Sequence, residues 1–147
     1  MIFPRYELKA DKSLAIFEFT SVGNKGEINK IVQYSETNLK DFYNLGFGDK
    51  DAITGEVDDK IISNNGDSQK VLATVVATVY AFTEKYPSAW IYATGSTKAR
   101  TRLYRIGITS NLAEIQNDFE LYGQREGEWQ EFNIGIEYEA FLVKRKG

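Results

Sequence analysis

The sequence predicts a single α+β domain: a mainly antiparallel sheet of about seven to eight strands packed on one long apolar helix, with a short basic helix and a further short helix. Strand-like segments fill the first third of the chain and its tail, and a long run without helix breakers lies between them. A short strand followed by a basic, helix-like segment comes next. The 147 residues, 42% of them hydrophobic, fit one globular domain spanning residues 1–147.

The first third alternates apolar and polar side chains with the period of two that is typical of half-buried strands. A turn, Gly23-Asn24-Lys25-Gly26, interrupts this pattern, because Gly and Asn tolerate positive φ. The pattern therefore predicts a short edge strand over 5–8, a hairpin of strands 14–22 and 28–34, a third strand over 43–47 and its partner over 57–63.

A long helix is expected over residues 68–85, with Asp67 as its N-cap and Pro87 just past its end. Val71, Val75 and Phe82 share one face, and alanines fill much of the remaining surface. A helix that is apolar almost all round belongs in the core. This segment is therefore expected to lie buried against the sheet.

The second half predicts a buried strand over 90–94 and a basic helix over 97–106 that stops at Gly107. A further short helix follows, over 112–117. The tail returns to sheet, with a hairpin of 119–122 and 129–132 and a final strand over 138–144 that includes Tyr138.

Two missing residue types limit the chemistry. The chain contains no cysteine, so disulfides, thiolate catalysis and cysteine-ligated metals are excluded. It contains no histidine, which removes Ser-His-Asp catalysis and the commonest metal ligand. We predict no metal site and no cofactor. No apolar run has the length of a signal peptide or a membrane span, so we expect a cytoplasmic protein without a membrane partner.

The strongest functional signal is a basic window in a chain whose net charge is −3. No Asp or Glu lies between Glu84 and Glu114. A glycine turn enters the basic helix there, and a helix N-terminus presents free N–H groups and a positive dipole end to anions. The predicted ligand-binding residues are Gly95, Ser96, Thr97, Lys98, Arg100, Arg102 and Arg105.

Helical spacing divides this window into stripes. Ala99, Leu103 and Ile106 form an apolar stripe that is expected to dock the helix on the core. Lys98, Arg102 and Arg105 form a second stripe that would then border a cleft. The alternative interpretation is that the arginines pair with the many acidic residues of the tail.

Three other groups are weaker candidates. Asp49, Asp58 and Asp67 could serve metal-assisted chemistry, although the calcium-loop spacing is absent. The turn Asn64-Asn65-Gly66-Asp67 could face the basic helix with an amide and a carboxylate. The aromatic residues Trp90, Tyr92, Trp129 and Tyr138 could stack on bases, although aromatic residues on alternating strands are more often part of the core.

Three functions remain open. The first is binding of a phosphate-bearing ligand, a nucleotide or single-stranded nucleic acid, at residues 95–105. The second is a histidine-free nucleotidyl- or acyl-group transferase, or a metal-dependent nuclease. The third is a protein–protein module, such as a toxin–antitoxin component, whose arginine stripe would meet a small acidic protein.

Five segments (25–34, 44–49, 63–67, 70–75 and 95–105) resemble a family of uncharacterised small bacterial proteins, mainly from Bacteroidetes. This resemblance implies a bacterial, cytoplasmic, single-domain protein and carries no activity. Residues 97–108 also resemble the late Ala, Leu-Tyr and Gly segment of GNAT-type acetyltransferases, in which a strand feeds a helix that cradles a pyrophosphate. Their glycine-rich cofactor loop, Arg/Gln-x-x-Gly-x-Gly/Ala, is missing here.

Overall fold

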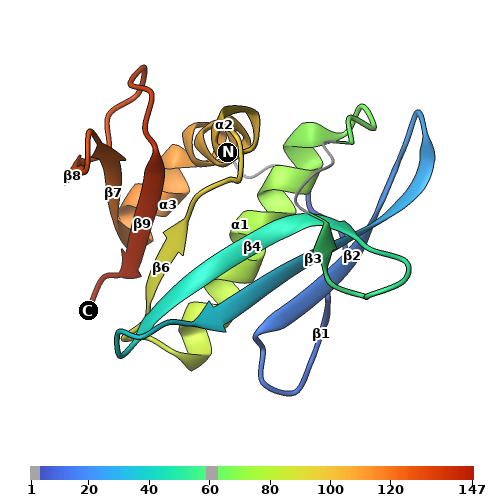
Figure 1. The fold of residues 1–147 in the computed structure, drawn as a ribbon, viewed down its shortest axis with the longest axis horizontal. Helices are drawn as coiled ribbons and strands as arrows, with labels where there is room; N and C mark the ends of the chain where they lie inside the picture. Colours follow the sequence, from blue (N-terminus) through green and yellow to red (C-terminus); the bar gives the residue numbers. More distant parts are fainter. Residues whose placement is uncertain (1–3, 59–62) are drawn as a thin grey trace.

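The computed structural model describes residues 4–58 and 63–147. Over these residues the chain forms one nine-stranded sheet and three helices, all on the same face of the sheet (Figure 1). The helices are α1 (Ser68–Lys85), α2 (Lys98–Ser110) and α3 (Leu112–Asp118). The strands are β1 (Lys9–Ala10), β2 (Ile16–Gly23), β3 (Gly26–Glu36), β4 (Phe42–Lys50), β5 (Val57–Asp58), β6 (Trp90–Ala93), β7 (Phe119–Arg125), β8 (Glu128–Glu131) and β9 (Ala140–Arg145).

The strands follow the order β1-β2-β3-β4-β6-β9-β7-β8, and β5 pairs with β4. Every pairing in the described chain is antiparallel except that of β4 with β6, which α1 connects. A parallel pair needs such a crossover, because a tight turn can only return the chain antiparallel. The predicted α+β class is therefore correct, and the sheet has one strand more than the upper limit expected.

The predicted hairpin of β2 and β3 is confirmed, with Gly23 opposite Gly26 at its turn. The buried Asn65 holds this turn from outside the hairpin. Its side chain accepts a hydrogen bond from the Lys25 N–H at 2.5 Å and donates one to the Gly26 carbonyl at 2.9 Å. The turn before α1 is thus anchored to the far end of the hairpin.

Helix α1 has the predicted limits, and its side chains pack on the strands in two neighbouring clusters. One cluster joins it to β2, β3, β4 and β6 through Val71, Val75 and Phe82. The other joins it to α3, β7 and β9 through Val76. The helix is not apolar all round, because the fully buried Thr74, Thr78 and Thr83 lie among its core residues. Each threonine hydroxyl donates to a carbonyl of the preceding turn.

Asp67 occupies the N-cap position as predicted, but its side chain does not cap the helix. The carboxylate instead accepts hydrogen bonds from the hydroxyls of Tyr6 and Ser21, both at 2.5 Å. It therefore ties the N-terminal segment and β2 to the start of α1.

Among the described residues, no helix combines the length and hydropathy that a membrane crossing requires.

Several predicted element limits were wrong. Residues 5–8 form no strand, because the Tyr6 N–H donates to Thr74 Oγ1 of α1 at 2.8 Å instead of to the sheet; β1 is Lys9–Ala10. The final strand begins at Ala140, and Tyr138 packs in the core before it. Of the partner strand expected over 57–63, the structure describes β5 at Val57–Asp58 and places Ser63 outside any strand. Residues 59–62, with Ile61 and Ile62, lie outside the described residues.

Candidate functional site

The turn between β6 and α2 is held by hydrogen bonds within the chain. Thr97 is the N-cap of α2, and its side chain accepts from the Arg100 N–H at 3.2 Å. The Gly95 N–H donates to Thr101 Oγ1 at 3.0 Å. The first N–H groups of any helix have no acceptor within the helix. Thr97 supplies an acceptor for Arg100, and the N–H groups of Lys98 and Ala99 face the open end of α2.

Gly95 is required by the helix that follows it. A Cβ at this position would lie 2.5 Å from the backbone nitrogen of Thr101 and 2.5 Å from Cβ of Arg100. The sequence interpretation placed this glycine among the ligand-binding residues. The structure shows that it permits the turn to pack directly against the first turn of α2.

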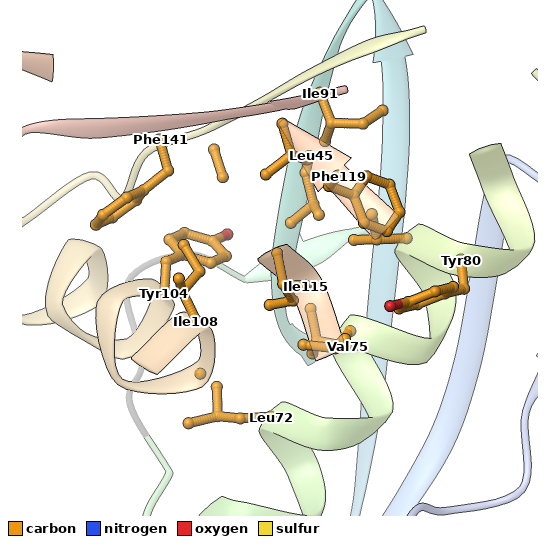
Figure 2. Close-up of a pocket in the computed structure, with 15 residues that line it drawn as sticks. Leu45, Leu72, Val75, Tyr80, Ile91, Tyr104, Ile108, Ile115, Phe119 and Phe141 are labelled. Atoms are coloured by element: carbon orange, nitrogen blue, oxygen red, sulfur yellow. The ribbon is translucent and has the colours of Figure 1, made fainter. Parts of the chain in front are cut away.

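The orientation of α2 differs from the prediction. Ala99 is exposed and Ile106 is 39% exposed, so the stripe of Ala99, Leu103 and Ile106 does not dock the helix. The buried side instead carries Gly107 and the core-packed Tyr104 and Ile108. These two side chains point from α2 toward an apolar cavity of about 70 Å³ that α1, α3 and the sheet also line (Figure 2).

Gly107 does not end α2, which continues to Ser110. A Cβ at Gly107 would lie 3.3 Å from Cβ of Leu72, so this glycine lets α2 approach α1 closely. Close contact with α1 therefore sets which side of α2 is buried, and that contact cannot be read from the composition of α2 alone.

Arg100 lies apart from the other basic side chains of α2. It is only 6% exposed, and its guanidinium donates to the Phe47 carbonyl of β4. A Cβ on Gly48 would come within 2.9 Å of the same guanidinium, so Gly48 provides the space that the arginine occupies. Arg100 thus joins α2 to β4 and does not line the groove described next.

The remaining predicted ligand-binding residues come together along a surface groove of about 530 Å³. Gly95, Ser96 and Thr97 line it from the turn, and Lys98, Arg102 and Arg105 line it from one side of α2. The ion pairs found in the described chain are Arg5–Glu114, Lys30–Asp49 and Lys50–Glu18. Among the described residues, the three groove cations Lys98, Arg102 and Arg105 form no ion pair.

The other wall of the groove carries two of the acidic tail residues that the alternative interpretation offered as ion-pair partners for the arginines, although neither forms such a pair among the described residues. It is formed by Glu137, Tyr138 and Glu139. Thr94 Oγ1 donates to the Glu139 carbonyl at 2.8 Å and holds the two walls together. The Glu139 carboxylate accepts from the Glu126 N–H at 2.5 Å. The groove therefore contains three cations and two carboxylates, one of which is already hydrogen-bonded.

A second hollow of about 290 Å³ adjoins the groove. The parallel strands β4 and β6 pair from Phe42–Trp90 to Leu45–Ala93, after which β4 continues and the chain after β6 turns into α2. The hollow lies at this divergence and includes Gly46 of β4 together with Arg100 and Tyr104 of α2. Thr94, Gly95 and Ser96 line both the hollow and the groove.

The carboxylates considered for metal chemistry are engaged in other contacts. Asp49 forms an ion pair with Lys30 and accepts from the Ser63 hydroxyl. Asp67 accepts from Tyr6, and the pKa of this phenol is raised above its ordinary value by burial and by that hydrogen bond. Asp58 lies opposite Asp49 in the β4–β5 pair. The part of the chain that the structure describes has no group of three acidic residues able to hold a metal ion.

The structure separates the aromatic candidates. Tyr138 belongs to the core, where its ring packs against Phe132 and Phe141. Ile91 and Ala93 of β6 face the core, so Trp90 and Tyr92 point to the helix-free side of the sheet. Tyr92 makes an edge contact with Trp129 there, with ring centroids 6.0 Å apart.

Comparisons with known proteins place the chain by family. No curated protein and no solved structure matches it. Residues 3–146, nearly the full chain, match the model of a family of unknown function, DUF6934. The chain therefore belongs to the DUF6934 family.

Proposed function

We propose that the protein binds a phosphate-bearing ligand, a nucleotide or single-stranded nucleic acid, in the groove at the start of α2. One observation carries the proposal: Lys98, Arg102 and Arg105 line a groove of about 530 Å³ beside the open N-terminus of α2. The first turn of α2 contains no acidic residue to compete for its N–H groups. A phosphate there would receive charge-assisted hydrogen bonds from the side chains and N–H groups.

Glu137 and Glu139 shape the specificity of this groove. Two carboxylates beside three cations leave one net positive charge, so the groove attracts an anion less strongly than its three cations alone would. Glu137 has no hydrogen bond or ion pair to any other described residue, so its charge acts directly on the groove. Replacement of Glu137 by Gln is expected to strengthen binding of ATP.

The test is calorimetric titration of the protein with ATP and with a short oligothymidylate. Arg102→Glu is expected to weaken binding roughly 10- to 100-fold, because a hydrogen bond to a charged group contributes about 1.5–3 kcal/mol. Lys12→Glu makes the same charge change at an exposed site outside the groove and is the matched control. The proposal is wrong if both variants bind like the wild type, or if ATP and the oligonucleotide do not bind.

A second function, acyl-group transfer from a pyrophosphate-bearing thioester, is favoured by the hollow between β4 and β6. In open sheets, ligands bind beyond the carboxyl ends of parallel strands. The hollow lies at such ends and continues the groove through Thr94–Ser96, so a ligand with its phosphates in the groove could extend an arm into it. In such a transfer the amine forms a C–N bond to the acyl carbon as the C–S bond breaks, and the proton that the amine loses ends on the thiolate. Tyr104 lines the hollow, and its phenol can donate to the thiolate and recover its proton from the amine.

Acetyl-coenzyme A is the probe for this second function. Release of free thiol in the presence of amine acceptors, lost in Tyr104→Phe while the nucleotide still binds, would support it. Binding of coenzyme A without any thiol release would leave the protein as a binding protein. These outcomes separate the two functions, because ATP binding alone is expected only from the first.

A further inference from the structure

The side of α2 that faces away from the groove borders a separate pocket of about 210 Å³. Its remaining wall comes from Lys30 of β3, the end of β4, and the turn and first residues of α1. One part of its wall is polar and includes Lys30, Asp49, Asp67 and Arg100. Another part is aliphatic and includes Leu72 and Ile106. None of the three groove cations lines this pocket, so the two hollows are distinct.

Lys30 lies on the face of β3 that carries the core residues Val32 and Tyr34, and it is 5% exposed. Its neighbour across the sheet is Asp49, with which it forms an ion pair. Burial of two charges costs several kcal/mol per ion, and an apolar pair at such positions is often equally stable. A buried ion pair that borders a hollow is therefore a candidate for recognition of a ligand.

The hydrogen bonds of this pair show what it can still bind. Both oxygens of Asp49 are used, one by Lys30 and one by the Ser63 hydroxyl. The Lys30 ammonium has three protons, and within the described residues Asp49 is its one acceptor. Lys30 therefore retains donor capacity beside the pocket. An oxygen acceptor on a ligand, such as a carboxylate, matches that capacity.

Asp67 supplies the complementary charge. Its carboxylate accepts hydrogen bonds from two neutral hydroxyls, and no ion pair involves it among the residues described. The charged side chains that line the pocket are two cations, Lys30 and Arg100, and two carboxylates, Asp49 and Asp67. A ligand with one charge of each sign can meet both the spare donors of Lys30 and the Asp67 carboxylate, whereas a simple anion or cation meets only one of them.

We propose that this pocket binds a small aliphatic α-amino acid. Its carboxylate would meet the donors of Lys30, its ammonium would meet Asp67, and its side chain would lie against Leu72, Leu103 and Ile106. The pocket volume of about 210 Å³ leaves room for several non-hydrogen atoms, as a small ligand requires.

The test uses L-leucine and two analogues that each lack one charged group. Isocaproate lacks the ammonium, and isoamylamine lacks the carboxylate. L-leucine at about 100 times its Kd is expected to raise Tm by roughly 5–10 °C, and neither analogue is expected to do so at the same concentration. A missing shift with L-leucine, or an equal shift with either analogue, would overturn the proposal.

Two variants connect any shift to this pocket. Ile106→Trp fills the aliphatic side of the pocket and is expected to abolish the L-leucine shift. Because Ile106 is 39% exposed, the fold is expected to tolerate the larger side chain. Ile134→Trp is the matched control, at a residue 65% exposed and outside the pocket. The double variant Lys30→Met/Asp49→Leu removes the donors without leaving an unpaired carboxylate and should also abolish the shift. A shift retained in either pocket variant contradicts the assignment.

Discussion

Replacement of Gly95 by alanine tests how the groove is built. Gly95 does not have a positive φ, so alanine can adopt its backbone conformation and the effect is steric alone. The added methyl would lie 2.5 Å from the Thr101 nitrogen and 2.7 Å from the Arg100 carbonyl carbon, well inside van der Waals contact. These are backbone atoms of a helix, so relief requires α2 to move away from the turn. Overpacking of this kind costs about 1–3 kcal/mol, and the rigid neighbours favour the upper half of that range.

The assay is urea denaturation followed by circular dichroism, with thermal unfolding as a second measurement. A loss of about 2–3 kcal/mol corresponds to a decrease in Tm of roughly 4–12 °C for a domain of this size. Gly46→Ala is the matched control, because a Cβ there would meet its nearest atoms at 3.9 Å, and its effect is expected to stay within about 1 kcal/mol. If Gly95→Ala is as stable as Gly46→Ala, the turn does not pack on α2 as described.

Two further predictions concern buried polar groups. Burial raises the pKa of Tyr34, whose hydroxyl pairs with Thr78 Oγ1 at 2.8 Å, so the folded protein keeps this proton while the unfolded chain ionises. The free energy of unfolding is therefore expected to decrease above about pH 10, by up to ~1.4 kcal/mol per pH unit for this group. Urea titrations at several pH values should show a smaller decrease for Tyr34→Phe. Lys30→Met alone should cost roughly 1–3 kcal/mol, because it leaves the partly buried Asp49 carboxylate without its cation, whereas Lys30→Met/Asp49→Leu should recover most of that loss. Equal stabilities of the two variants would refute the pairing.

Periodic patterns and breakers were sufficient for the central hairpin and for the long helix, but not for the edge strand expected over 5–8. The hairpin at Gly23–Gly26 and the limits of α1 follow from local signals, namely glycine in a turn and a long run that ends before proline. The parallel pairing of β4 with β6 and the insertion of β9 between β6 and β7 do not. These pairings join segments far apart in the chain, and no local pattern specifies which strand becomes a neighbour.

The prediction for the basic helix failed where a distant residue decided the outcome. Helical spacing correctly grouped Lys98, Arg102 and Arg105 on one side. It placed the buried side on Ala99, Leu103 and Ile106, because apolar side chains were assumed to face the core. The close contact of Gly107 with Leu72 of α1 buries a different side of α2. The sequence interpretation had taken Gly107 as the end of the helix and so missed this contact.

Arg100 shows why the charge of a segment does not define its site. Four basic side chains within eight residues indicated one anion-binding surface, yet Arg100 is buried against the Phe47 carbonyl, at a position that Gly48 leaves open. A guanidinium can be buried where donors find acceptors and space, and both come here from β4, about fifty residues earlier in the chain.

The same arginine lines the amino-acid pocket and the hollow between β4 and β6. Because Arg100 contributes to both, a ligand that displaces its guanidinium in one would alter the other, so occupancy of the two hollows is expected to be coupled. Titration of acetyl-coenzyme A, whose acyl arm is proposed to enter the hollow between β4 and β6, with and without L-leucine measures that coupling directly, and identical affinities would show that the two hollows are independent.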